Sequence, residues 1–135
     1  MISLELAKKL KEAGLEWEPK QGDFYWFVTP DESQTGFVQS NRGAEGFKAH
    51  VDRCRGIVCT YVFAPRLDQL LAEIEKRGFI WALDVSATNG NKVIGYAMNI
   101  ATSLDWEDEE EFRSDSPEEA AASALLWILE GGTSK

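Results

Sequence analysis

Apolar residues recur with a helical period in three segments of the chain. In residues 4–13 they fall on one face of a helix, which Ser3 precedes. Gly14 follows, and glycine readily takes the left-handed conformation that ends a helix. The second segment follows Pro65 and ends at Gly78, and the third follows a Ser-Pro-Glu-Glu capping box that begins at Ser116. The apolar positions of the first two segments are Leu6, Ala7, Leu10, Ala13, Leu67, Leu70, Leu71 and Ile74. The pattern predicts helices over 4–13, 65–77 and 117–130.

Aromatic and β-branched residues dominate the segments between these helices. The run 24–28 reads Phe-Tyr-Trp-Phe-Val and the run 57–63 is also β-prone, so each predicts a strand. Residues 79–87 and 92–101 carry apolar alternations on either side of Asn-Gly, which is the strongest short-range signal of a β-hairpin. Residues 31–56 are rich in glycine and lack periodicity, which predicts a loop region with one short strand at most.

The predicted hairpin has two unlike faces. A register that pairs Ala87 with Lys92, Val85 with Ile94 and Leu83 with Tyr96 gathers the bulky residues on one face, where we expect two helices to cover them. The other face carries small or polar residues, which let a second backbone or a ligand approach closely. The candidate binding residues on it are Asp84, Ser86, Gly95 and Asn99. A face that is simply solvated is the alternative.

An acidic segment follows the hairpin at residues 105–111. Such a block is typical of a solvated loop or of a segment that contacts a basic partner, and it lacks the glycine spacing of a calcium loop. Tryptophans near loops can also line a stacking pocket. The segment adds four candidate binding residues, Trp106, Glu109, Glu110 and Glu111.

Cysteine and histidine offer little for catalysis or metal binding. His50, Asp52, Cys54 and Cys59 are close in sequence, but no second Cys or His pair exists to complete a zinc site. A Cys–His nucleophile would also need an orienting group and an oxyanion site, which no motif supplies. We therefore predict no metal, no cofactor and no catalytic residue, and keep a small thiol- or metal-dependent enzyme as an alternative.

Composition restricts the partners. The chain has 135 residues, a formal net charge of −9 and 44% hydrophobic residues, as a single globular domain would have. The negative charge disfavours nucleic acid, because binding to a phosphate backbone depends on Lys and Arg. We expect no export signal and no membrane span, and the two cysteines suit a reducing compartment, so the predicted location is the cytoplasm.

Three helical segments resemble small uncharacterised proteins encoded by phages and prophages of Firmicutes. The likeness rests on Ser-Leu-Glu-Leu-Ala-Lys-Lys-Leu-Lys-Glu-Ala-Gly-Leu at residues 3–15, Pro-Arg-Leu-Asp-Gln-Leu-Leu at 65–71 and Ser-Pro-Glu-Glu-Ala-Ala at 116–121. The resemblance implies a phage accessory protein, a group that includes inhibitors of host defence, which would act in the host cytoplasm. It brings no catalytic residues.

Together these patterns predict one α+β domain over residues 1–135. We expect a two-layer sandwich with a mostly antiparallel sheet of four to six strands, covered on one face by helices. The predicted function is a non-enzymatic binding module that engages a protein through its acidic segment or its small-residue surface. A protein that binds a nucleotide or metabolite is the alternative from another class, and a homodimer is also left open.

Overall fold

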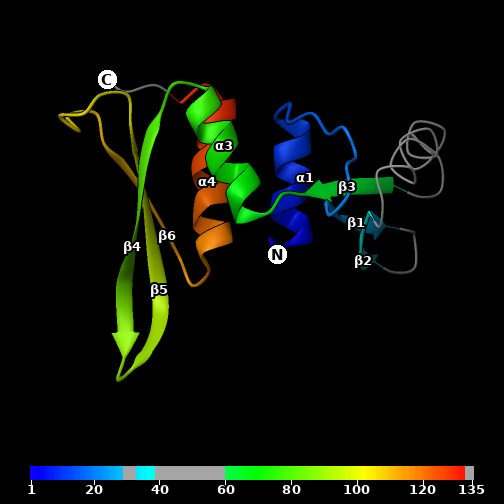
Figure 1. Cartoon of the computed structure of the whole chain (residues 1–135), viewed down its shortest axis with the longest axis horizontal. Helices are drawn as coiled ribbons and strands as arrows, with labels where there is room; N and C mark the ends of the chain where they lie inside the picture. The colour runs from blue at the N-terminus through cyan, green and yellow to red at the C-terminus, as the bar shows by residue number, and fades with distance from the viewer. Residues whose placement is uncertain (29–32, 39–59, 133–135) are drawn as a thin grey trace. The chain divides into compact units, whose positions relative to one another are not determined.

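The computed structural model describes residues 1–28, 33–38 and 60–132, and shows an α+β protein (Figure 1). The strands in these ranges do not form one sheet of four to six strands. They form two three-stranded antiparallel sheets. The chain divides into two compact units, one made of Met1 and Ser3–Arg66 and the other of Ile2 and Leu67–Lys135, and each unit holds one of the sheets. That the whole chain forms one domain stays a prediction.

The first unit contains helix α1 (Leu4–Glu12) and strands β1 (Phe24–Val28), β2 (Ser33–Phe37) and β3 (Thr60–Ala64), in the sheet order β2-β1-β3. The Ser3 hydroxyl accepts a hydrogen bond from the backbone N–H of Leu6 at 3.2 Å, and Gly14 takes φ +104°, so both predicted helix ends are confirmed. Strand β1 has the predicted bounds. Strand β2 is the short strand expected within 31–56, and the start of the predicted 57–63 strand lies outside the described residues.

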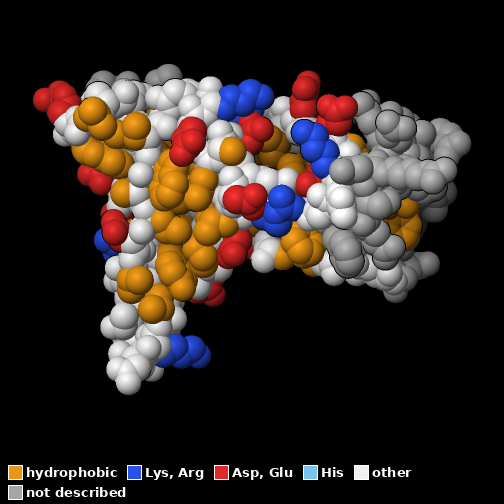
Figure 2. Space-filling view, viewed as in Figure 1, with side chains coloured by type: hydrophobic (Ala, Val, Ile, Leu, Met, Phe, Trp, Pro, Cys, Tyr) orange, Lys and Arg blue, Asp and Glu red, His pale blue; other side chains and the backbone are white. Residues whose placement is uncertain are grey.

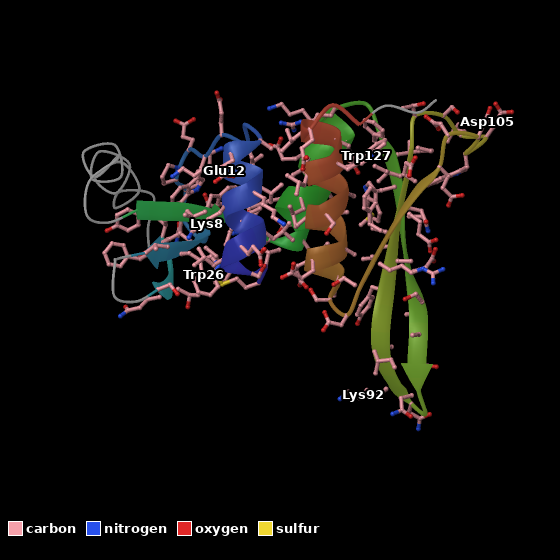
Figure 3. All side chains as sticks on the ribbon, turned by 180° about the vertical axis from the view of Figure 1, so that it is seen from behind. Lys8, Glu12, Trp26, Lys92, Asp105 and Trp127 are labelled. Carbon is pink, nitrogen blue, oxygen red and sulfur yellow. The ribbon has the colours of Figure 1, made fainter. Side chains whose placement is uncertain are left out.

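The second unit contains α3 (Leu67–Lys76), β4 (Ile80–Asn89), β5 (Lys92–Ala101), β6 (Glu110–Ser114) and α4 (Pro117–Leu129), in the sheet order β4-β5-β6. Helix α4 packs on β5 and β6, and α3 packs on α4 and β4. The ring of Trp127 in α4 lies 6.0 Å from the ring of Phe112 in β6, which places α4 on the sheet face that carries Phe112 (Figure 3). Ser116 caps α4 by accepting the backbone N–H of Glu119 at 3.1 Å, as predicted.

The hairpin β4–β5 forms with the predicted faces but not with the predicted register. Asn89 pairs with Lys92 and Leu83 with Met98, a shift of two residues from the prediction. The loop is therefore the pair Gly90-Asn91, with Gly90 at φ +62° in the first central position, as in a type II′ turn. Because the shift is even, the side chains of the regularly paired residues stay on the faces to which the alternation assigned them. The pairing is irregular between Val85 and Thr88.

Candidate functional site

The candidate site is the face of the β4-β5-β6 sheet opposite α4, which we call the open face. Residues paired across antiparallel strands point to the same side, so the pairs of Phe112 define the helix face and the alternate pairs define the open face. Its side chains form two adjacent rows across the three strands, Asp84–Ala97–Arg113 and Ala82–Asn99–Glu111. Side chains project from the sheet on the side away from the helices in Figure 3.

Charges of both signs lie at the margins of the open face, around a small-residue centre. Asp84 on β4 is exposed, and Ala97 in the centre is only 4% exposed. On β6 the Nε of Arg113 lies 3.0 Å from Oε1 of Glu111, and the two side chains are 69% and 42% exposed. An ion pair of this kind adds little to stability because water screens it, so both groups are available to a partner.

Ser86 and Gly95 meet where the hairpin pairing becomes irregular. A Cβ built on Gly95 would lie 2.8 Å from the Ser86 hydroxyl oxygen and 3.2 Å from the Cβ of Ala87. The side chains of Ser86 and Ala87 occupy the space that a side chain at Gly95 would need, and Ser86 is exposed. Ser86 and Gly95, two of the candidate binding residues, therefore lie at the irregularity in the hairpin pairing, next to the Asp84 row.

The structure divides the predicted acidic segment. Glu110 and Glu111 belong to β6, a strand that the acidic composition hid, and the alternation places Glu110 on the helix face and Glu111 on the open face. Trp106 and Glu109 lie in the turn between β5 and β6, where Trp106 takes φ +55° and its backbone N–H donates to the carbonyl of Ser103. Of the eight predicted binding residues, Asp84, Asn99 and Glu111 share the open face, Ser86 and Gly95 lie beside it, and Trp106, Glu109 and Glu110 do not belong to it.

Two carboxylates hold the β5–β6 turn in shape. Asp108 accepts from the backbone N–H of Thr102 at 3.1 Å and from its hydroxyl. Asp105 accepts from the Ser103 hydroxyl at 2.5 Å and from the backbone N–H of Glu107 at 3.1 Å, and these bonds hold the pKa of Asp105 below its usual value. Part of the acidic segment is thus structural, and does not act only as free surface charge.

Sequence reasoning missed Arg113 and an apolar surface on the hairpin. Arg113 follows Phe112 in β6 and so points to the opposite face, the one that carries Glu111. Had that strand been recognised from the sequence, Arg113 would have been placed on the open face. Val85 and Ile94 are 53% and 45% exposed, although both belong to the face that the hairpin pattern predicted to be covered by helices. The hairpin extends past the ends of α3 and α4, which leaves this apolar surface uncovered (Figures 1 and 2).

The remaining candidates add no chemistry to the described part of the chain. His50, Asp52, Cys54 and Cys59 lie outside it. Within residues 1–28, 33–38 and 60–132 no group of three His, Cys, Asp or Glu side chains is placed to hold a metal ion. None of the helices in these ranges is long and apolar enough to span a membrane.

Asp23 is the buried charged residue of the described chain, at 3% exposed. Its carboxylate accepts from the Trp17 indole N–H at 3.0 Å and from the backbone N–H of Lys20 at 2.9 Å, and Nη1 of Arg66 lies 3.6 Å from it. These bonds fold the segment between α1 and β1, and the Trp17 ring stacks on Phe63 with centroids 5.3 Å apart. The arrangement satisfies a buried charge, so we assign it a structural role.

We compared the chain with known protein families, curated proteins and solved structures. No family model, no curated protein and no solved structure matches it. The site therefore has to be interpreted from its own residues.

Proposed function

We propose that the chain is a non-enzymatic protein-binding module and that the open face of the β4-β5-β6 sheet is its binding surface. The observation that carries the proposal is that Asp84, Asn99 and Glu111, from three different strands, lie in two adjacent rows on one face. Asp84 and Asn99 were candidates as part of the small-residue face of the hairpin and Glu111 as part of the acidic segment, and the fold gathers all three opposite the helices.

The chemistry of the open face suits a protein surface. Ala82 and Ala97 are small and Ala97 is only 4% exposed, so the contacts with a partner would come from the larger side chains beside them. Asp84, Glu111 and Arg113 add charges of both signs at the margin, which set orientation and exclude mismatched partners more than they add affinity. The chain carries a net charge of −9, so a partner with a basic surface would be attracted over a distance.

The resemblance to phage proteins suggests the kind of partner that the open face would bind. A phage accessory protein acts on its host, so the partner would be a host protein in the host cytoplasm. The resemblance lies in the helical segments, whereas the proposed binding surface lies on the sheet, so binding at the open face does not depend on the resemblance.

Capture on the immobilised chain tests the binding surface. We expect proteins retained from a bacterial lysate by the wild-type chain to be lost with Asp84→Arg and with Asn99→Arg. Glu5→Arg is the matched control, because it makes the same charge change as Asp84→Arg on an 81% exposed side chain of α1. Glu109→Arg tests the turn separately. Equal capture by the wild-type chain and both open-face variants would reject the proposal, and loss with Glu109→Arg alone would move the binding site to the turn.

A second candidate function is favoured by the aromatic residues of the first unit. Tyr25 and Phe63 face the same side of the sheet, and Trp17 lies with its ring 6.1 Å from Tyr25 and stacked on Phe63. A half-buried aromatic cluster of this kind can stack a nucleotide base or a metabolite ring. A saturable change in tryptophan fluorescence that Trp17→Phe removes would support ligand binding, and an unchanged response in that variant would exclude this cluster.

A further inference from the structure

The outer edge of β4 has the features of a surface that pairs with a second copy of the chain. Strand β4 has ten residues, and of the strands that the structure describes only β5 pairs with it. An edge strand presents a row of backbone donors and acceptors to any strand that approaches. Its regular part, Ile80–Val85, contains neither proline nor lysine, the residues that commonly block such pairing.

Exposed apolar side chains lie beside this edge. Val85 on β4 is 53% exposed on the helix face, and Ile94 on β5 is 45% exposed close to it. Figure 2 shows hydrophobic side chains continuing along the hairpin toward its tip, where Figure 3 labels Lys92. Clustered exposure of large apolar residues is typical of interaction surfaces.

Charge favours a second copy as the occupant. The chain carries a net charge of −9, so most contacts between two copies would bring acidic surfaces together. The paired segment Ile80–Val85 carries one charged residue, Asp84, and the hairpin from Val85 to Asn99 carries one, Lys92. The β4 edge is thus a weakly charged surface, and the contact between two acidic chains there depends on keeping their Asp84 carboxylates apart.

We propose that two copies pair antiparallel through β4, about a twofold axis at Leu83, to form a continuous six-stranded sheet. This register places Val85 opposite the partner's Trp81 on the helix face, and Asp84 opposite the partner's Ala82 on the open face. A register centred on Asp84 would instead bring two carboxylates together. A register centred on Ala82 would place Val85 beyond the start of the partner strand.

The mass of the full chain in solution tests the pairing. By sedimentation equilibrium we expect the wild-type mass to rise with concentration from 15.1 kDa toward twice that value. Val85→Lys should remain at the mass of one copy, although it lowers the net negative charge. Leu104→Lys, the control, makes the same substitution type on a side chain that is 86% exposed in the β5–β6 turn, and should associate as the wild type does. A wild-type mass of one copy throughout, or an associating Val85→Lys variant, would overturn the proposal.

Disulfide formation tests the register. Paired residues of antiparallel strands have Cα atoms about 4.5 to 5.5 Å apart, within the range of a disulfide. In a background of Cys54→Ser and Cys59→Ser, Ala82→Cys and Asp84→Cys should each remain uncrosslinked alone and form a covalent dimer when mixed. A covalent dimer from either variant alone, or none from the mixture, would contradict this register. The proposed pairing uses the edge of β4, whereas the proposed function uses the open face. The result of the capture assay with the Asp84→Arg variant therefore does not decide whether two copies pair.

Discussion

The carboxylate of Asp108 accepts hydrogen bonds from the backbone N–H and the hydroxyl of Thr102, and so joins the two ends of the β5–β6 turn. Removing it would leave the Thr102 N–H to water and loosen the connection to β6. We expect Asp108→Ala to lower the free energy of unfolding by about 1 kcal/mol, the usual value of a side-chain acceptor at such a position. Urea unfolding of Asp108→Ala against Glu107→Ala, which removes the same charge from an exposed neighbour, measures it. Equal losses in the two variants would refute the structural role of Asp108.

The pH dependence of stability reports on Asp105. Its hydrogen bonds from Ser103 and from the backbone N–H of Glu107 lower its pKa in the folded state below the ordinary value of 3.8. The contribution of Asp105 to stability is therefore full above pH 3.8 and is lost as the pH falls through the lower folded-state pKa. Unfolding curves at a series of acidic pH values should fall less steeply for Asp105→Asn than for the wild type. Parallel curves would show that Asp105 has the same pKa in both states.

Gly36 makes room for Tyr25. A Cβ at Gly36 would lie 2.6 Å from Cζ of the Tyr25 ring, and that ring packs edge-on against Tyr61 at 5.6 Å. We expect Gly36→Ala to destabilise the protein by about 1 to 3 kcal/mol, as overpacking does. Thermal unfolding of the variant measures the loss. In a Tyr25→Leu background the same substitution should cost much less, and an unchanged cost would place the strain elsewhere.

Asp23 should be the most sensitive charged residue in the described part of the first unit. Substitution by Ala leaves the Trp17 indole N–H and the Lys20 backbone N–H without their acceptor in a buried position. We expect Asp23→Ala to cost about 3 kcal/mol, with a shift in tryptophan emission. Trp17→Phe retains an aromatic ring against Phe63 and loses only the donor, so about 1 kcal/mol is expected. A smaller loss for Asp23→Ala than for Trp17→Phe would show that the carboxylate does not organise this segment.

Periodicity predicted the helices and the two faces of the hairpin well, because both depend on local spacing. Ser3, Ser116 and Gly14 act at the helix ends as their residue types indicate. The hairpin register was wrong by two residues because Asn-Gly is compatible with more than one loop length, and only Gly90 takes a positive φ here. Faces survive an even shift, which is why Asp84 and Asn99 were correctly grouped.

Strand β6 and the division into two sheets could not be predicted in the same way. Strand β6 has one apolar residue, Phe112, among charged neighbours, so its alternation is invisible until Trp127 is known to pack on it. Arg113 was missed for that reason. The choice between one sheet and two depends on pairing between distant segments, which no local pattern records.

Position-specific photo-crosslinking tests directly whether the open face binds a protein. A benzophenone amino acid in place of Asp84 or Glu111 would lie on the open face, and one in place of Lys9 would lie on an exposed site of α1. In lysate, we expect the same crosslinked protein from positions 84 and 111, competed away by excess wild-type chain, and its absence from position 9. Identical crosslinks from all three positions, or none from 84 and 111, would contradict it.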